Sequence, residues 1–596
     1  PPRSTPKPSS AASDVYKRQY LLIVKNKIIQ STYIFLLIIF SCKNQTYYNE
    51  YAIVSAKKEA TLAGIKILEM GGNAFDAMIA VDLALAVVYP NAGNLGGGGF
   101  LVYRDNKGNI GSLDYREKAP LRASEKMFLD NENNIIPNLS REGAFSVAVP
   151  GTPAGLFEIY QRFGSIPLDS IFKPALYLAK DGFKLTKRQA NLFNSSKNKI
   201  LELNNNIELF NNDFHEGFLF KNIQLYKTLL YLLENGLNSF YTGKNAEKII
   251  EYLSSKGGII SQDDLVKYQP IWRDPYVFEY KDLKIITMGL PSSGGIVMNQ
   301  ILKSLNFLDQ KSLFDSDLQY VRALVELEKL SFADRSFYLG DPDFIDDSFI
   351  DSIVSDNYLL SRFNSINFEN PKKSLEIKHG NFNLNESDET THYSIVDSFG
   401  NAVSVTTTLN SNFGSKLIPP SLGFFLNNEM DDFSIKSGYP NIYGLVGGEN
   451  NSLVAEKRML SSMTPTLIEK NNKTYMILGS PGGPTIITSI LQTILNVSLF
   501  NMNIKEAVNR GRFHHIWLPD KIFYEINTFN EKTKNKLIDI GYKFAETFSS
   551  IGRVDAILIE NNKIFTAPDP RLSLIHISEP TRPERISDAV LCLEKK

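Results

Sequence analysis

The segment formed by residues 74–88 is apolar on almost every face of a helix, so it must be buried in a large core. Asn73 precedes it as a typical N-cap, and Asp76 stands at the third helical position, where a capping box places its acid. Pro90 follows the end of the segment, and residues 56–70 before it carry apolar side chains on one helical face. With 596 residues the chain has room for such a core, in two to four domains or in one large α/β unit.

Strand-like runs alternate with helical segments in both halves of the chain, which predicts a layered α/β architecture. The expected strands are residues 100–103, residues 393–397 and 402–409 around a turn at 398–401, and residues 474–478, and a helix is expected at residues 485–495. Residues 156–360 read as helices separated by polar connections, and two glycine-bearing segments, at residues 150–155 and 291–295, interrupt this half.

The composition excludes several classes of function. A net charge of -1 and the lack of a basic run with interleaved aromatic residues argue against a nucleic-acid partner. The two cysteines, Cys42 and Cys592, lie outside the expected globular part, which excludes a disulfide framework there. No Cys/His cluster has zinc-ligand spacing, and the His514-His515 pair is interpreted as structural because no second ligand group stands near it. We therefore expect neither a metal ion nor a cofactor.

Four consecutive glycines begin at Gly96 in the loop N-A-G-N-L-G-G-G-G-F, residues 91–100. A phosphate-binding loop follows a strand and continues into G-K-[ST], whereas this loop precedes a strand and lacks that continuation, so nucleotide binding is disfavoured. Glycines without a Cβ instead allow backbone conformations and close approaches that other residues forbid.

Both ends of the chain differ in character from its middle. Residues 1–19 and 572–596 resemble translated adapter sequence and are set aside from the fold. Residues 20–42 are typical of an export signal, with lysines before a short apolar run. The signal ends in I-F-S-C, which is similar to a bacterial lipobox with Cys42 as the lipidated residue; an ordinary signal peptide is the alternative. The expected location is the periplasm or the outer membrane, with a lipid anchor in the second case.

A sharp change of pattern occurs at Thr390. Residues 363–389 are polar and without periodicity, and the run E-T-T-H-Y-S-I-V-D that follows opens a strand. A threonine hydroxyl needs a neighbouring base to act as a nucleophile, and an N-terminal threonine supplies its own α-amine, with a pKa of about 7.7–8.0. A linker that can be cut before a rigid strand fits this chemistry. Alone, however, the motif also fits two β-forming residues at a strand start.

Further motifs occur in a fixed order along the chain: G-G-N-A-x-D-A, G-G-G-G-F, D-Y-R-E-K-A-P, T-T-H-Y-S, T-L-N, N-N-E-M-D-D-F, S-S-M-T-P-T and G-S-P-G-G. Together they resemble the gamma-glutamyltransferase family over residues 52–571. The resemblance implies the four-layer αββα sandwich of N-terminal-nucleophile hydrolases. It also implies a precursor in which Thr390 attacks the carbonyl of Glu389, leaving a large subunit (residues 43–389) paired with a small one (residues 390–571).

The resemblance also implies roles for individual residues. Thr390 is the expected nucleophile, Thr408 the residue that orients it, and Gly482 and Gly483 the oxyanion-hole pair; a plain strand-to-helix turn is the alternative for the glycines. A carboxylate site is expected from Arg116, Ser461 and Ser462, and an ammonium site from Asn410, Glu429 and Asp432. Residues 438–457 resemble a lid loop, with Tyr443 as the gating residue.

The implied activity is cleavage of gamma-glutamyl amides such as glutathione through a gamma-glutamyl-threonine ester, with water, an amino acid or a peptide as acceptor. A cephalosporin or glutaryl acylase of the same superfamily is one alternative, which lacks an α-ammonium site. A non-enzymatic amino-acid-binding lipoprotein is another. It could use Arg116 and Asp432 but has no need of Thr390, Thr408 and the glycine pair together.

Overall fold

The computed structural model describes residues 47–571 except residues 206, 378–389, 437, 442–443, 527 and 546–549. The chain divides into residues 1–47 and residues 48–596, and the architecture below is that of the second unit. The adapter-like ends, the export signal with Cys42, the cleavage residue Glu389 and the expected gating residue Tyr443 lie outside the described residues.

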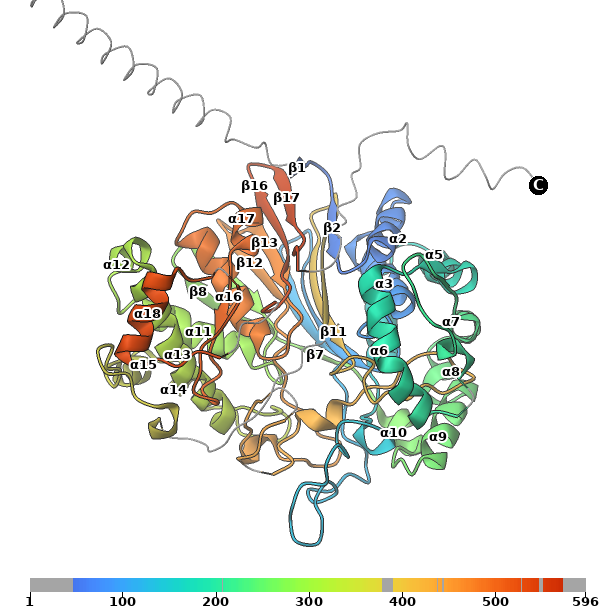
Figure 1. Ribbon diagram of the computed structural model, residues 1–596. Helices are drawn as coiled ribbons and strands as arrows, with labels where there is room; N and C mark the ends of the chain where they lie inside the picture. Colours follow the sequence, from blue (N-terminus) through green and yellow to red (C-terminus); the bar gives the residue numbers. More distant parts are fainter. Residues whose placement is uncertain are drawn as a thin grey trace, which may run out of the picture. The chain divides into compact units, whose positions relative to one another are not determined.

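Two antiparallel sheets form the centre of this unit (Figure 1). The larger sheet has the order β1 (Tyr47–Tyr48), β17 (Lys563–Ala567), β16 (Asp555–Glu560), β13 (Lys473–Gly479), β12 (Thr466–Lys470), β9 (Leu283–Thr287) and β8 (Tyr276–Tyr280). The smaller has the order β2 (Ala52–Ser55), β10 (Thr391–Val396), β11 (Ala402–Thr408), β3 (Gly98–Arg104), β4 (Ile110–Asp114) and β7 (Ile271–Arg273). Two short hairpins, β5 (Phe183–Lys184) with β6 (Leu219–Phe220) and β14 (Phe513–His514) with β15 (Phe523–Tyr524), lie outside these sheets.

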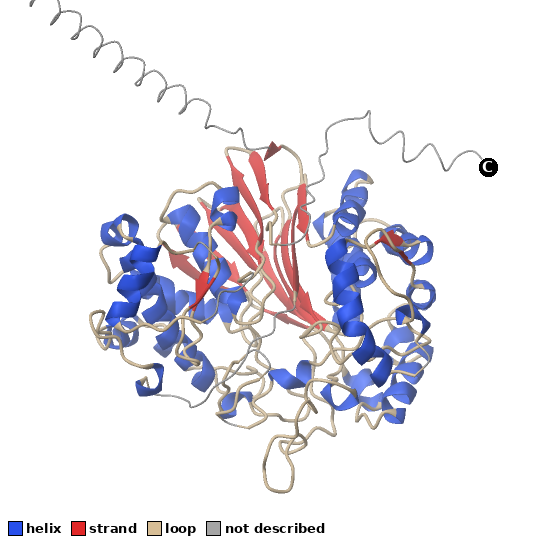
Figure 2. Ribbon diagram, viewed as in Figure 1, coloured by secondary structure: helices blue, strands red, loops and turns tan. Residues whose placement is uncertain are grey.

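Helices cover the outer face of each sheet, which makes four layers (Figure 2). The smaller sheet is covered by the helical side that comprises α2 (Lys58–Glu69), α3 (Ala74–Val88), α4 (Thr152–Phe163), α5 (Leu168–Asp181), α6 (Lys187–Leu203), α7 (Ile223–Asn235), α8 (Asn238–Tyr241), α9 (Lys244–Ser255) and α10 (Gln262–Lys267). The larger is covered by the side that comprises α11 (Gly294–Leu305), α12 (Gln310–Asp315), α13 (Asp317–Tyr338), α14 (Ile350–Ile353), α15 (Asp356–Phe363), α16 (Thr485–Ser498), α17 (Ile504–Asn509) and α18 (Glu531–Ile540). The αββα sandwich expected from the family resemblance is confirmed.

Alternation along the strands divides the core between the layers. Phe100 and Val102 of β3 belong to the same buried cluster as Ile477 of β13, between the sheets. Leu101 of the same strand belongs to the cluster that contains Leu85 of α3 on the outer face. Successive side chains of a strand point to opposite faces, so one apolar strand serves both interfaces of the sandwich.

Helix α3 spans Ala74–Val88 as predicted, and every one of its residues is buried. The Asn73 side chain accepts hydrogen bonds from Phe75 and Asp76, and Asp76 completes the capping box. The prediction that residues 156–360 form helices separated by polar connections is wrong at the short hairpin of β5 and β6 and at β7, β8 and β9. In β8 only Phe278 and Tyr280 are buried, because this strand lies at the edge of its sheet.

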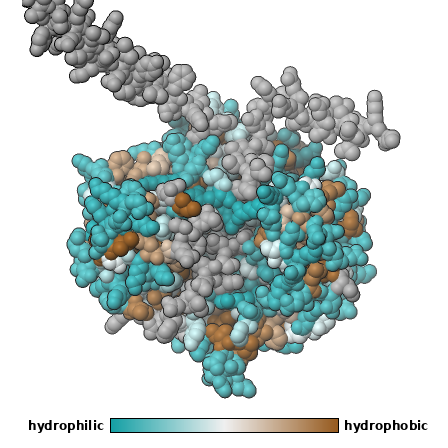
Figure 3. Space-filling view, viewed as in Figure 1, coloured by the Kyte–Doolittle hydropathy of each residue, from teal (hydrophilic) through white to brown (hydrophobic). Residues whose placement is uncertain are grey.

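The surface in Figure 3 is covered mostly by hydrophilic residues, with apolar residues in small separate patches. Such scattered apolar side chains are usual on a protein surface. In the described part of the chain, no helix combines the length and the apolar character needed to cross a bilayer.

Candidate active site

Thr390 and Thr408 stand at adjacent ends of two paired strands. Thr391 of β10 pairs with Thr407 of β11, so Thr390 comes directly before one strand and Thr408 ends the other. Their hydroxyl oxygens lie 3.5 Å apart, and Thr390 is buried. The backbone N–H of Asn410 donates to the Thr408 hydroxyl at 2.8 Å, which holds that oxygen beside Thr390.

The glycine quartet supports this position from the loop that leads into β3. Asn94 accepts a hydrogen bond from the backbone N–H of Gly97 at 2.6 Å and donates to the carbonyl of Thr408 at 2.8 Å. A Cβ on Gly97 would lie 2.0 Å from that carbonyl, and one on Gly96 would lie 2.2 Å from the carbonyl of Phe425. The glycines thus permit the close backbone approach expected of them, and they fix the strand end that carries Thr408.

Gly482 and Gly483 form the turn between β13 and α16. Their φ angles are 125° and 51°, in the region that favours glycine. Both carbonyls accept hydrogen bonds from the first turn of α16, at Thr485 and Ile486. Their buried N–H groups donate to no partner in the described part of the chain. Buried N–H groups are nearly always paired, so this turn is suited to bind an oxygen anion in front of the helix.

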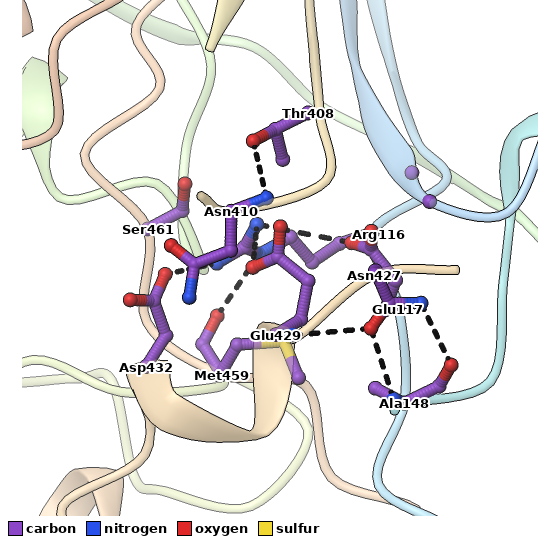
Figure 4. A network of polar contacts seen from close by, with 12 residues as sticks. Arg116, Glu117, Ala148, Thr408, Asn410, Asn427, Glu429, Asp432, Met459 and Ser461 are labelled. Carbon is purple, nitrogen blue, oxygen red and sulfur yellow. Dashed lines mark hydrogen bonds and ion pairs between the residues drawn. The ribbon is translucent and has the colours of Figure 1, made fainter. Parts of the chain in front are cut away.

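Arg116 lies at the centre of a buried charge cluster (Figure 4). Its guanidinium is 2.7 Å from the carboxylate of Glu429 and 2.6 Å from that of Asp432, and a third carboxylate, Glu117, lies 3.8 Å away. Glu429 and Asp432 belong to a single 3₁₀ turn, Glu429–Asp432, so both face the same guanidinium. The cation and the anions predicted to bind opposite ends of one substrate are therefore paired with each other.

Burial and charge act against each other in this cluster. Burial raises the pKa of Asp432 to about 6 and that of Glu117 to about 8, although the Arg116 guanidinium acts to lower both. Burial also raises the pKa of Glu429, again against the effect of Arg116. Burial alone would lower the pKa of Arg116, but the three carboxylates outweigh it and raise that pKa. Arg116 stays cationic, while Glu117 is largely protonated at neutral pH.

Two asparagines that the sequence analysis did not single out hold the acidic turn in place. Asn427 binds the backbone of Gly96 and Ala148 through its side chain, and Asn428 accepts from the backbone and the hydroxyl of Ser411. Asn410, with φ 74°, donates to the carbonyl of Asn428 at 3.0 Å. The N-N-E-M-D-D-F motif contains both asparagines, but nothing in its pattern separates these supports from the residues that face the pocket.

Ser461 and Ser462 are placed by residues 291–295, the P-S-S-G-G segment. Residues Ser292 and Ser461 form a parallel bridge, and the Ser293 hydroxyl donates to the carbonyl of Ser461 at 2.7 Å. A Cβ on Gly294 would lie 1.8 Å from the Thr464 hydroxyl, so this approach requires a glycine. The segment that interrupts the helical half of the sequence is therefore the support of the serine pair.

The expected lid segment packs against the charge cluster. Asn441 donates to the Asp432 carboxylate at 2.9 Å, and Leu445 lines the pocket. Gly448 donates its N–H to the carbonyl of Ser336 on α13 at 2.8 Å, which ties the segment to the second helical layer.

One pocket brings most of the predicted site residues together. Its lining includes the predicted residues Arg116, Thr390, Thr408, Asn410, Glu429, Asp432, Ser461, Ser462 and Gly483. It also includes Arg335 of α13, which the sequence analysis missed. Charged residues occur along the whole of α13, a pattern that usually indicates a solvated helix, so no local signal singled Arg335 out.

The histidine pair lies elsewhere, in β14 and beyond it. His514 is 2.9 Å from the Thr488 hydroxyl, and the backbone N–H of His515 donates to Glu328. Burial lowers the pKa of both imidazoles, so both are neutral at pH 7. Among the residues that the structure describes, no group of His, Cys, Asp and Glu side chains is arranged to hold a metal ion.

Comparisons with known proteins point to one family. The family described as Gamma-glutamyltranspeptidase matches residues 60–574. The glutathione hydrolase proenzyme of Escherichia coli strain K12 is 39% identical over 524 residues, covering 87% of this chain and 90% of that protein. The gamma-glutamyltranspeptidase structure from Helicobacter pylori is 37% identical with a TM-score of 0.54, and covers 58% of this chain and 99% of its own. A cephalosporin acylase structure from Bacillus halodurans has a TM-score of 0.77 at 22% identity, and the match covers 89% of this chain and 96% of that chain. The two proteins therefore share the fold.

Proposed function

Since this chain belongs to the gamma-glutamyltranspeptidase family, we propose that it is a self-processing glutathione hydrolase that uses Thr390 as its nucleophile. The observation that carries the proposal is the position of Thr390. It lies in one pocket with Thr408, with the Gly482-Gly483 turn and with a buried cluster of opposite charges. A nucleophile, a group that orients it, an oxyanion site and a site for a zwitterion are together what hydrolysis of a gamma-glutamyl amide needs.

Maturation is the first reaction. The Thr390 hydroxyl attacks the carbonyl carbon of Glu389, the bond to the Thr390 nitrogen breaks, and the acyl group moves to the Thr390 oxygen as an ester. Water then hydrolyses the ester, which leaves the carboxylate of Glu389 and a free α-amine on Thr390. The products are a large subunit, residues 43–389, and a small subunit, residues 390–571, which stay together because β10 and β11 of the small subunit lie between β2 and β3 of the large one.

Turnover then uses the new amine as base. It takes the hydroxyl proton of Thr390 while the oxygen attacks the γ-carbonyl of the donor, and Thr408 orients that oxygen. The N–H groups of Gly482 and Gly483 stabilise the negative charge on the former carbonyl oxygen. The amine leaving group takes the proton, and a gamma-glutamyl ester remains on Thr390. Water, or the amine of an amino acid or a peptide, then resolves this ester.

The charge cluster is proposed to recognise the α-carbon groups of the donor. Arg116, Ser461 and Ser462 bind the carboxylate, and Asn410, Glu429 and Asp432 bind the ammonium. A donor ammonium takes the place of the Arg116 guanidinium beside Glu429 and Asp432, so the cluster exchanges one set of ion pairs for another without leaving a buried charge unpaired. An acylase for glutaryl or cephalosporin substrates has no use for two carboxylates here, which favours a glutamyl donor.

We also propose that the protein is exported, because residues 20–42 have the features of a signal ending at Cys42. A bacterium that secretes the chain should place it in the membrane fraction, and Cys42→Ala should release it. An equal distribution of both forms would favour an ordinary signal peptide.

The intact mass of the purified protein tests the function, with Thr390→Ala measured beside it. Two fragments that meet between Glu389 and Thr390 are expected for the natural sequence, and one uncut chain for the variant. The cut protein should hydrolyse glutathione and L-γ-glutamyl-p-nitroanilide. A single uncut chain without hydrolysis would instead support the amino-acid-binding alternative.

A further inference from the structure

Arg335 is the second cation in the wall of the pocket, and its surroundings differ from those of Arg116. It is 4% exposed, and it lies on α13, a helix of the large-subunit region. Its Nε donates to the Ser293 hydroxyl at 2.9 Å and its Nη2 to the Ser462 hydroxyl at 3.3 Å. Within the described residues, no carboxylate lies within ion-pair distance of its guanidinium, whereas Arg116 has three.

A buried guanidinium with only hydroxyl partners is costly unless an anion joins it. Burial lowers the pKa of Arg335 to about 10, with Asp432 opposing the shift, so the side chain is still a cation at neutral pH. Arg335 and Asp432 each line both the Thr390 pocket and the adjoining pocket beneath the lid segment. The unbalanced positive charge therefore faces the space in which a donor substrate lies.

We infer that Arg335 binds the α-carboxylate of the donor directly and shares it with Ser462 and Arg116. The inference rests on the proposed function and adds a specificity residue to it. Ser462 already bonds Arg335, and Ser461 is the neighbouring serine at the pocket (Figure 4), so a carboxylate beside this pair meets the guanidinium as well. The planar guanidinium has N–H groups beyond the two that bond serines.

The site then recognises a zwitterion by two cations and two anions. Arg116 and Arg335 face Glu429 and Asp432, and a donor brings one positive and one negative group. Without Arg335, the donor carboxylate would share Arg116 with both acidic residues, and the site would hold an excess of negative charge. Arg335 supplies the charge that makes a donor with a carboxylate preferable to one without it.

Two chromogenic donors test the inference. L-γ-Glutamyl-p-nitroanilide has both α-groups, and 4-aminobutyryl-p-nitroanilide has the amine but lacks the carboxylate. Arg335→Gln should lower kcat/KM for the glutamyl donor about 10- to 100-fold, mainly through KM. It should change kcat/KM for the 4-aminobutyryl donor by less than about threefold. Arg335→Lys keeps the charge but not the planar guanidinium, so it should lower kcat/KM for the glutamyl donor less than Arg335→Gln does. An equal loss on both donors would overturn the inference.

A positioning role through Ser462 is separated by a double-mutant cycle. If Arg335 contacts the carboxylate, Arg335→Gln should still lower the glutamyl selectivity in a Ser462→Ala background. If the second substitution has no further effect, Arg335 acts only by orienting Ser462, and the direct contact is rejected. Where 4-aminobutyryl turnover is too slow to follow, the inhibition constants of L-glutamate and 4-aminobutanoate give the same comparison.

The fold and the proposed function have separate controls. Each variant is first examined for its two fragments and its Tm, and Arg335→Lys replaces Arg335→Gln if the latter stays uncut. Failure of the proposed function appears in the natural sequence itself, as an uncut chain without hydrolysis of the glutamyl donor. Failure of the Arg335 inference appears only as a lost difference between donors in an enzyme that is cut and active.

Discussion

The hydroxyl oxygens of Thr390 and Thr408 lie 3.5 Å apart, while the backbone N–H of Asn410 donates to the Thr408 oxygen at 2.8 Å. Thr408→Val keeps the shape of the side chain and removes the group that orients the nucleophile. We expect kcat to fall about 10- to 100-fold and self-cleavage to slow in parallel, because both reactions use the same oxygen. Initial rates and the time course of fragment formation measure the two effects.

The matched control for this change is Thr407→Val. Thr407 is equally buried and its hydroxyl donates to the carbonyl of Gly98 at 2.9 Å, so the control loses a hydrogen bond of β11 that does not reach the nucleophile. Its Tm should fall while kcat stays near that of the natural enzyme. Similar losses of kcat in the two variants would mean that Thr408 serves the strand and not Thr390.

The oxyanion role of the glycine turn predicts a loss in kcat without a matching change in KM. Gly483, at φ 51°, lines the pocket, and Gly483→Ala would strain the backbone and displace its N–H. Losing one oxyanion donor costs about 10²- to 10³-fold in kcat. Steady-state kinetics with the glutamyl p-nitroanilide should give this split.

Gly541→Ala separates backbone strain from chemistry. Gly541 has φ 113° at the end of α18, and a Cβ there would meet nothing within 4 Å. Gly541→Ala places an alanine at a positive φ, which strains the backbone, but residue 541 does not line the pocket. The substitution should therefore lower the stability of the protein and leave kcat unchanged. A comparable loss of kcat at Gly541 would refute the oxyanion assignment at Gly483.

Local patterns predicted the elements that depend on their own sequence. Helix α3 and its capping box at Asn73 follow from short-range rules, because the apolar run and the cap residues are adjacent in the chain. The edge strand β8 was missed although its sequence, Y-V-F-E-Y, consists mostly of β-forming residues, because a run of five residues is too short to distinguish the period of a strand from that of a helix.

The site could be predicted only where a motif carried it. Arg116 was found through its motif, but its ion pairs with Glu429 and Asp432 join segments more than 300 residues apart, and no local pattern encodes them. Arg335 belongs to no such motif. Its burial depends on Ser293, on Ser462 and on the lid segment, which pack against α13. Long-range packing, and not residue type, decides which charged side chains face the pocket.

The raised pKa of Asp432, about 6, predicts a pH dependence with two limbs. The Thr390 amine must lose its proton to act as base, with an ordinary pKa of about 7.7–8.0, so log(kcat/KM) should fall with slope 1 below that range. Below about pH 6 the Asp432 carboxylate is protonated as well and loses the donor ammonium, so the slope should approach 2. Asp432→Asn should be less active over the whole pH range, and its slope should stay at 1 below about pH 6. If the variant keeps the slope of 2 below about pH 6, a group other than Asp432 is responsible for the second limb.

The lid contacts predict a change in donor size. Deleting residues 438–449 removes the Asn441 contact with Asp432 and the Leu445 side chain from the pocket. Self-cleavage should remain, because the Thr390 and Thr408 strands do not include this segment. Hydrolysis of long poly-γ-glutamyl chains relative to glutathione should rise several-fold. If relative rates for short and long donors stay the same, the segment does not limit donor size.

Asp82 of α3 predicts how stability depends on pH. It is fully buried and accepts a hydrogen bond from the Tyr393 hydroxyl at 2.8 Å, and burial raises its pKa to about 7. Because this folded pKa lies above the unfolded value of about 3.9, the stabilising contribution is complete below pH 4 and is lost as pH rises towards 7. The loss is on the order of 4 kcal/mol at most, since the shift is about three pKa units and each unit corresponds to about 1.4 kcal/mol.

Asp82→Asn should therefore flatten the dependence of Tm on pH. The amide oxygen can still accept the Tyr393 hydroxyl, but it cannot ionise, so between pH 5 and pH 8 the variant should lose a few degrees less than the natural protein. Tyr393→Phe should have the opposite effect, because it removes the hydrogen bond that favours the carboxylate and so raises the pKa of Asp82 further. Parallel Tm profiles for the natural protein and Asp82→Asn would show that this carboxyl group does not titrate in the core over that range.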